Sequence, residues 1–402
     1  MKKATQQQTK EHNRHLVLKT IFEHTDTSRA EIARITKLTR TTVSDIVADL
    51  IGEGLVDEIG IGSSIGGKSP ILLSLVDDSR CMIGLNLGQD QFRGAVVNLR
   101  GNLREVVTLP VNDRNGEDAL ALVFEILDRL MRVACSPVVG IGVGTPGLVN
   151  TREGVVVNAV NLDWTNLPLA RLIKDIYALP VYVLNDSQAA AMGEFTYGRD
   201  HQADDHLIVI NIRHGIGAGI IINGRLFQGD GGGAGEIGHV VVVTEGGLLC
   251  RCGKRGCLET VASARAILQR IQGASEGLTG FSFGPTPQEI SLEAVERAFR
   301  GEDPLVQEVV LDSGRYLGLA ISGLVGTLNI RKIVLTGDMT RFGAPWLRVI
   351  QETVSQYSLA GLAGDTQVEI GQLAEDPVIL GASALLANDY GLLLRQQPAE
   401  AV

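Results

Sequence analysis

The sequence has few of the residues that mark several large protein classes. Its 402 residues include only five cysteines, too few for a secreted scaffold held together by disulfides. No apolar run approaches the roughly 18 residues that span a membrane. The amino-terminal segment MKKATQQQTKEHNRH is polar and has no apolar stretch behind its lysines, unlike a secretory signal. We therefore expect a cytoplasmic protein that does not associate with membranes.

Positive charge is also scarce, because the net charge is −10. Residues 1–80 contain as many Lys and Arg as Asp and Glu, so the rest of the chain carries the whole acidic excess. An acidic body does not bind nucleic acid by itself, whereas a locally neutral end can. The abundant residue is glycine, with 48 copies. Glycine beside many Val, Ile and Leu is typical of an α/β protein, and the length suggests two or three domains.

Residues 1–78 have the pattern of a winged helix-turn-helix domain. Ser28 and Glu31 form a capping box that begins one helix, and the turn KLT separates it from a second helix that ends before Gly54. The second helix places its apolar residues on one face: Val43, Ile46, Val47 and Leu50. Two β-type runs around the tip GSSIGGKSP predict a wing hairpin.

Such a domain can be structural or dimerising, but helix, turn, helix and wing in this order are typical of DNA binding. The second helix would enter the major groove with Arg40, Thr41, Thr42 and Ser44. Lys68 in the wing supplies charge without the planar fork of arginine, so we expect it to contact phosphate.

The remaining chain predicts two α/β lobes, at 79–199 and 200–376, with a closing helix at about 377–390 that returns to the first lobe. The segments CMIGLNLGQDQFRGAVV and HLIVINIRHGIGAGIIING repeat the theme of strand, glycine turn and strand. This recurrence indicates a duplicated fold with a ligand-binding cleft between its halves.

Three of the five cysteines lie within the segment GGLLCRCGKRGC, eleven residues or more after a histidine. His239, Cys250, Cys252 and Cys257 make a Cys₃His set, which is typical of structural zinc. The alternative is a reduced loop of thiols without metal. We expect Cys81 and Cys135, which have apolar neighbours, to be buried as small hydrophobic side chains.

Several motifs together resemble the ROK family (repressors, open reading frames and kinases). They are GEIGH followed by CRCGKRGCLE, and also NDSQAAAMGE, GVGTPGLV and NAVNLDW. The resemblance implies a two-lobed, sugar-kinase-like body of the actin and hexokinase type, with a ribonuclease-H-like fold. It also implies a sugar site formed by Asn161, Asn185, Asp186, Glu236, His239 and Glu259.

The resemblance leaves two functions open, a sugar kinase and a sugar sensor. Family kinases have an Asp-x-Gly-Gly-Thr loop, where this chain has NLGQD, with Asn86, Gln89 and Asp90 at the changed positions. A second loop has Arg213 and His214 in place of Gly-Thr, and the third has Gly337 followed by Asp338. Removing glycines and adding carboxylates oppose the binding of phosphate.

The sequence therefore predicts a sugar-responsive DNA-binding regulator, a repressor of an operon for a carbohydrate such as xylose or glucose, and no enzyme activity. We expect a homodimer or tetramer on operator DNA, a small sugar effector and structural zinc. The alternative is an ATP-dependent, glucokinase-like sugar kinase, in which Asp186 would be the base.

Overall fold

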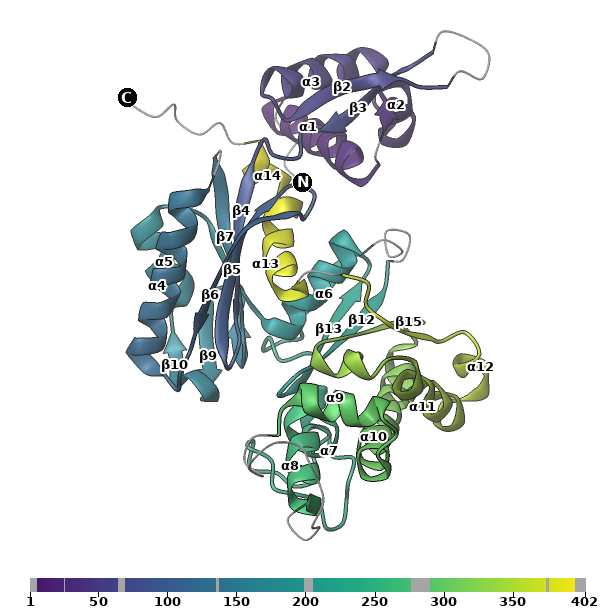
Figure 1. The fold of residues 1–402 in the computed structure, drawn as a ribbon. Coiled ribbons are helices and arrows are strands. Elements are labelled where there is room, and N and C mark those ends of the chain that lie inside the picture. Colours follow the sequence, from purple (N-terminus) through teal and green to yellow (C-terminus); the bar gives the residue numbers. More distant parts are fainter. Residues whose placement is uncertain are drawn as a thin grey trace.

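The computed structural model describes residues 6–24, 26–63, 69–134, 137–198, 205–275, 290–373 and 376–394. These residues form an amino-terminal domain and two α/β lobes (Figure 1). The amino-terminal domain lies against one end of the first lobe, and the second lobe lies at the opposite end of the molecule (Figure 1).

The helices and strands of the amino-terminal domain follow one another in the order that the sequence predicts. Its elements are α1 (Gln6–Glu23), β1 (Thr27–Ser28), α2 (Arg29–Thr36), α3 (Arg40–Gly52), β2 (Val56–Ile61) and β3 (Ile71–Leu75). The three strands pair in the order β1-β3-β2. The predicted apolar face of α3 is buried, and the domain's core also includes Val17, Ile21 and Ile32.

One detail of the capping box differs from the prediction. The Ser28 hydroxyl accepts a hydrogen bond from the Glu31 backbone N–H, as expected for the residue before α2. The Glu31 carboxylate, however, accepts hydrogen bonds from the Arg34 guanidinium. The sequence pattern alone does not reveal this competing cation one turn further along the helix.

The first lobe is built on a five-stranded sheet in the order β11-β7-β4-β5-β6. Its strands are β4 (Cys81–Leu87), β5 (Gln91–Asn98), β6 (Leu103–Pro110), β7 (Val138–Thr145) and β11 (Val181–Asn185). The helices α4 (Gly116–Val133) and α5 (Leu169–Tyr177) lie on its outer face (Figure 1). Cys81 is buried in β4 as expected, and Cys135 lies outside the described residues.

A small sheet extends the first lobe near the cleft. Its strands β8 (Leu148–Asn150), β9 (Val155–Ala159) and β10 (Trp164–Leu167) pair in the order β10-β9-β8, and the short helix η1 (Val160–Leu162) separates the last two. The sequence patterns do not predict these strands, because each has only three to five residues.

The second lobe repeats the sheet topology of the first, in the order β14-β13-β12-β15-β16. Its strands are β12 (Leu207–Ile212), β13 (Ile216–Ile222), β14 (Arg225–Phe227), β15 (Lys332–Thr336) and β16 (Gln367–Ile370). In each lobe an antiparallel meander is followed by two parallel strands. The duplicated fold expected from the recurring strand and turn pattern is therefore present.

Helices cover the second sheet on its outer side: α7 (Glu259–Ala262), α8 (Ala264–Ser275), α9 (Leu292–Arg300), α10 (Pro304–Leu328), η4 (Asp338–Phe342), α11 (Gly343–Tyr357) and α12 (Ala360–Ala363). Of these, α10 is long and apolar enough to cross a membrane by length and composition alone. Half of the most apolar 18-residue stretch of this helix is buried inside the protein, and its residues Leu317 and Ile321 belong to the core of the lobe. It is therefore a core helix here.

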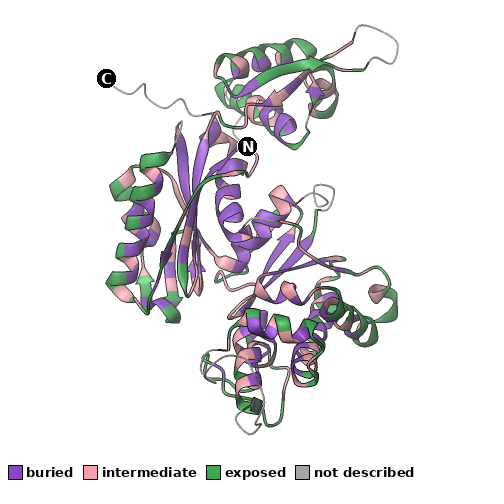
Figure 2. Cartoon of the chain, in the orientation of Figure 1, coloured by how far each residue is buried: buried purple, intermediate pink, exposed green. Residues whose placement is uncertain are grey.

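Two helices lie between the two sheets. α6 (Asp186–Tyr197) packs on β12 and β13, while α13 (Pro377–Asn388) packs on β4 and β7 and against α6. Figure 2 shows both helices buried, like the sheets they join, whereas the outer helices expose one face. The short helix α14 (Tyr390–Leu393) continues from α13 and contacts α1 of the amino-terminal domain.

Candidate functional site

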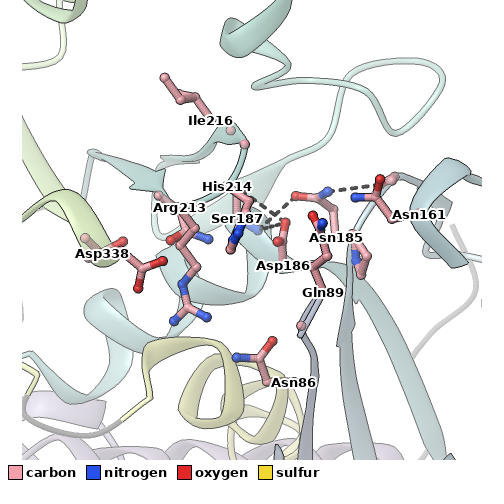
Figure 3. Close-up of a pocket in the computed structure, with 18 of the residues that line it drawn as sticks. Asn86, Gln89, Asn161, Asn185, Asp186, Ser187, Arg213, His214, Ile216 and Asp338 are labelled. Atoms are coloured by element: carbon pink, nitrogen blue, oxygen red, sulfur yellow. Dashed lines mark hydrogen bonds between the residues drawn. The ribbon is translucent and has the colours of Figure 1, made fainter. Parts of the chain in front are cut away.

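A cleft of about 980 Å³ lies between the two lobes. Its lining includes all six residues that the resemblance assigns to sugar binding: Asn161, Asn185, Asp186, Glu236, His239 and Glu259. It also includes the three loops compared with the kinase pattern, and residues from both sheets. The cleft is thus the place where residues far apart in the sequence meet (Figure 3).

The amino-terminal end of α6 supplies Asn185 and Asp186. The side-chain Oδ1 of Asn185 accepts hydrogen bonds from the backbone N–H groups of Ser187 and Gln188, so Asn185 is the N-cap of α6. Its amide donates to the carbonyl oxygen of Gly147 at 2.9 Å. These contacts fix the side chain of Asn185 and place Asp186 in the first turn of the helix, facing the cleft (Figure 3).

Asp186 has its Oδ1 close to Ser187, from which it accepts hydrogen bonds by the backbone N–H and the hydroxyl. Burial raises the pKa of Asp186, and the positive charge of Arg213 acts in the opposite direction. A buried carboxylate with a fixed orientation is a strong hydrogen-bond acceptor for a ligand hydroxyl.

Glu236 and Glu259 bring two more carboxylates to the same region. Burial raises the pKa of Glu236, and the negative charges of Asp186 and Glu259 add to this effect. Glu259, the first residue of α7, accepts hydrogen bonds from the Ile216 backbone N–H and from the Arg265 guanidinium at 3.0 Å. Glu259 is therefore anchored within its own lobe, a restraint that the sequence interpretation did not include.

Asn161 approaches the cleft from the first lobe, in η1. Its side-chain Oδ1 accepts a hydrogen bond of 2.7 Å from Arg251, which lies between Cys250 and Cys252 in the second lobe. This bond joins the two lobes across the mouth of the cleft. Sequence patterns do not single out Arg251, because a lone arginine between two cysteines is usually solvated.

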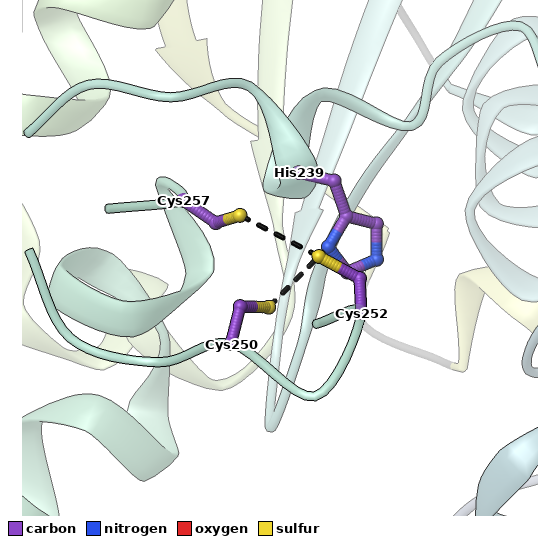
Figure 4. A group of neighbouring side chains, drawn as sticks. All are labelled: His239, Cys250, Cys252 and Cys257. Carbon is purple, nitrogen blue, oxygen red and sulfur yellow. Dashed lines mark hydrogen bonds between the residues drawn. The ribbon is translucent and has the colours of Figure 1, made fainter. Parts of the chain in front are cut away.

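The four potential metal ligands meet in one place (Figure 4). The imidazole nitrogen of His239 and the sulfur atoms of Cys250, Cys252 and Cys257 all lie within 4.8 Å of one another. The Cys250 sulfur is 3.5 Å from His239 Nδ1, and the Cys252 sulfur is 3.6 Å from that of Cys257. Tetrahedral zinc, with Zn–S of about 2.3 Å and Zn–N of about 2.0 Å, holds its donors about 3.5–3.8 Å apart. The donor set therefore fits this metal.

The orientation of His239 connects this cluster with the cleft. Its Nδ1 faces the cysteine sulfurs, while its Nε2 lies 3.9 Å from Glu236 Oε2. An ion held by the four side chains would have no open coordination position, so its chemistry would be structural. It would fix the imidazole so that Nε2 can reach a ligand in the cleft.

The opposite end of the cleft contains a cluster that sequence reasoning missed. Asp376, the N-cap of α13, accepts a 2.7 Å hydrogen bond from the Asn86 amide and lies 3.5 Å from the Arg93 guanidinium. Arg213 reaches the same carboxylate from the second lobe, at 3.7 Å. The changed loop positions Asn86 and Arg213 are thus tied to an acid at the base of the closing helix.

A second cross-cleft pair lies beside this cluster. His214 Nε2 is 3.8 Å from the Asp90 carboxylate. The neighbouring residues Arg213 and His214 therefore face acids from two different segments of the chain, Asp376 and Asp90. Asp186, Asp90, Asp338 and Asp376 line this end together with two arginines and one histidine. This balance offers no surplus of positive charge to a polyanion such as a nucleotide.

The amino-terminal domain displays most of the residues predicted to contact DNA. Arg40, Thr41 and Ser44 are exposed at the beginning of α3, whereas Thr42 is half-buried. The Thr42 hydroxyl lies 2.8 Å from that of Thr39, and its backbone N–H donates to the same Thr39 oxygen. Thr42 therefore helps to cap α3. Lys68 lies outside the described residues.

Comparison with known proteins identifies the family of the chain. The model of the ROK family matches residues 82–389. A protein named xylose repressor from Caldicellulosiruptor bescii is 32% identical over 390 residues, which are 94% of this chain and 96% of that protein. A solved ROK family transcriptional regulator, described as a homologue of the Escherichia coli MLC protein, has 29% identity and a TM-score of 0.82, with 96% of this chain and 98% of that one covered.

Kinases of the family match a smaller part of the chain. A ROK family glucokinase from Streptomyces griseus, solved in complex with glucose and AMPPNP, is 27% identical with a TM-score of 0.68. The match covers 98% of the glucokinase but 76% of this chain. The two regulators extend over nearly the whole chain, including its amino-terminal domain.

Proposed function

Because the chain belongs to the ROK family, we propose that it is a sugar-responsive, DNA-binding transcriptional regulator. It acts as a repressor of an operon for the use of a carbohydrate such as xylose or glucose. The observation that carries this proposal is the union, in one chain, of a winged helix-turn-helix domain with a polar cleft. The exposed start of α3 fits the major groove, and the cleft offers hydrogen-bonding groups to a polyol.

The chemistry of the cleft favours a neutral sugar as effector. Carboxylates of Asp186 and Glu236 accept hydrogen bonds from hydroxyl groups, and the amides of Asn161 and Asn185 can donate or accept. Glu259 and His239 complete the proposed sugar site. Buried polar groups of this kind discriminate strongly against ligands that lack the matching hydroxyl.

The proposed cofactor is structural Zn²⁺, held by His239, Cys250, Cys252 and Cys257. The spacing of the four donor atoms supports it. We propose a cytoplasmic homodimer or tetramer, since a dimer pairs two neutral DNA-binding domains on an inverted repeat of operator DNA. Two linked domains bind more tightly than one because the second contact is intramolecular.

A sugar kinase is the second candidate, and the position of Asp186 at the start of α6 is the observation that favours it. Phosphoryl transfer requires the phosphates of ATP to be cradled and neutralised. Here Arg213 is paired with Asp376, and Asp90 lies near His214. Arg213, His214 and Asp90 belong to the loops that would bind phosphate in a kinase of the family, and their charges are already paired with one another or with Asp376. We propose that the chain has no kinase activity.

The test uses the full chain. Its preferred duplex is selected from a randomised DNA pool, and the affinity for that duplex is then measured by fluorescence anisotropy with and without D-xylose, D-glucose and other common sugars. The proposal expects sequence-selective binding that one sugar class changes. A coupled assay with ATP runs in parallel. Turnover of the roughly 1–100 s⁻¹ usual for kinases, without selective DNA binding, would establish the second candidate instead.

A further inference from the structure

Arg213 pairs with the acid that caps the closing helix. It follows β12 in the second lobe, and its guanidinium lies 3.7 Å from the Asp376 carboxylate. Its charge also acts on Asp186, the residue that begins α6. In Figure 3 the guanidinium points toward Asn86 and the helix beneath it, and away from the Asp186 carboxylate.

Asp376 is a junction of three segments. Its Oδ2 accepts the hydrogen bond from Asn86 of β4 and faces Arg93 of β5, both in the first lobe. Its Oδ1 accepts a hydrogen bond from the Val378 backbone N–H and faces Arg213 of the second lobe. The side chain is only 2% exposed, so water screens these interactions little.

The helix that begins at Asp376 leads to the DNA-binding domain. α13 runs along the first sheet and is followed by α14, which contacts α1. The rings of Phe22 in α1 and Tyr390 in α14 pack edge to face, with their centroids 6.1 Å apart. The Arg100 guanidinium donates to the Phe22 carbonyl oxygen at 2.8 Å. α1 and α14 thus share one hydrophobic cluster with the first sheet.

We propose that the ion pair between Arg213 and Asp376 couples the sugar cleft to the DNA-binding domain. A sugar held between the lobes changes their relative position, and with it the distance between Arg213 of the second lobe and Asp376 at the start of the closing helix. The α13–α14 segment transmits this change to α1. This inference rests on the proposed function and adds the residue that links its two halves.

The mechanism meets the thermodynamic requirement for coupling. A ligand shifts a conformational equilibrium only by its difference in affinity for the two states. Here that difference arises because the cleft takes residues from both lobes, such as Asn161 from the first and Glu236 from the second, so the sugar binds one lobe position more tightly than another. The Arg213–Asp376 pair joins both lobes, so its strength biases their relative position. By linkage, DNA binding changes sugar affinity by the same factor.

The test compares three single substitutions in the full chain. Arg213→Met keeps the aliphatic length and removes the charge, and Asp376→Asn keeps the N-cap oxygen of α13 while removing the other charge. The matched control is Arg270→Met, which removes an arginine of equal exposure, 29%, from a pair with Asp312 outside the cleft. Circular dichroism and urea unfolding establish that each variant is folded.

The first measurement needs neither sugar nor DNA. Hydrogen–deuterium exchange is followed in peptides covering 6–23 and 376–394. Weakening the pair across the lobes should accelerate exchange at the α1–α14 contact about tenfold in R213M and D376N, while R270M stays like the wild type. Unchanged exchange in both cleft variants overturns the proposal. Because Asp376→Asn preserves the cap, it decides the result if R213M does not fold.

The second measurement determines the ratio of DNA affinities with and without D-xylose or D-glucose, using the selected duplex. R213M should still bind the sugar, as calorimetry would show, but its affinity ratio should fall to within about twofold of unity. R270M should keep the ratio of the wild type. A full wild-type ratio in R213M overturns the proposal. If the wild type itself shows no ratio, the proposed function fails, and the exchange measurement alone decides the role of Arg213.

Discussion

Gly381 of α13 lies directly against the backbone of Ala189 in α6. A Cβ atom on Gly381 would overlap the carbonyl oxygen of Ala189, and Gly193 of α6 is in similarly close contact with Pro377. The two helices that join the lobes therefore cross at a distance that only glycine permits. This crossing sets the relative positions of Asp186 and Asp376, which lie at the amino-terminal ends of the two helices and line the cleft.

Gly381→Ala should consequently destabilise the protein. Overpacking a tight contact usually costs about 1–3 kcal/mol, and here the overlap is with backbone, so we expect about 3 kcal/mol or more in urea unfolding. The matched control is Gly323→Ala in α10, where a Cβ would meet nothing within 4 Å. That control should stabilise the protein by about 0.5–1 kcal/mol, since alanine favours helix. Equal effects of both substitutions would contradict the tight crossing.

Glu194 predicts a pH dependence of stability. It lies in α6 with 1% exposure, and burial raises its pKa to about 7. An ordinary glutamate in the unfolded chain has a pKa near 4.5. The folded state thus holds the proton more tightly, and its contribution to stability is complete below pH 4.5 and is lost as the pH rises to about 7.

Glu194→Gln removes this titration while keeping the shape of the side chain. Relative to the wild type, the free energy of unfolding of the variant should therefore rise between about pH 5 and pH 8, by an amount on the order of 3 kcal/mol. Glu125→Gln on the exposed side of α4 should show the wild-type slope. Parallel profiles for wild type and E194Q in urea unfolding across this range would show that Glu194 does not titrate as expected.

The metal cluster predicts one tightly held zinc ion per chain. Cys252→Ser removes one donor, so elemental analysis after chelator washing should give well below one zinc per chain, together with a lower melting temperature. The effect should reach the cleft, because His239 is both a donor in the cluster and a neighbour of Glu236. Cys81→Ala, in β4, is the control and should retain the metal. Full zinc occupancy in C252S would remove the Cys₃His assignment.

Sequence patterns identified the features that depend on local order. The apolar face of α3 and the three closely spaced cysteines each lie within a short stretch of sequence, so the helix and the donor cluster could be predicted from neighbouring residues. The hydrogen bond between Asn86 and Asp376 joins residues 290 positions apart. The sequence identified Asn86 only as the loss of a phosphate-loop acid. Its partner could not be found, because an acid before a helix is most often just a cap.

The restraint on Glu259 was missed for a related reason. The motif placed it in the cleft, which it lines, but the ion pair with Arg265 depends on how α7 and α8 follow one another in space. Short strands such as β8, with three residues, also leave too little alternation to be recognised.

The last prediction concerns DNA. Arg40→Ala removes an exposed guanidinium at the beginning of α3 and should weaken operator binding by about 1–3 kcal/mol, with relaxed preference at one base pair if Arg40 reads guanine. Lys68→Ala should lower affinity for all sequences alike and flatten the salt dependence, because phosphate contacts carry no sequence information.

Arg171→Ala on α5 of the first lobe, where the side chain is 81% exposed, is the control for charge alone and should bind like the wild type. Anisotropy titrations over a series of salt concentrations and single-base variants of the selected duplex separate these effects. Equal losses for R40A and R171A would show that the start of α3 does not enter the groove.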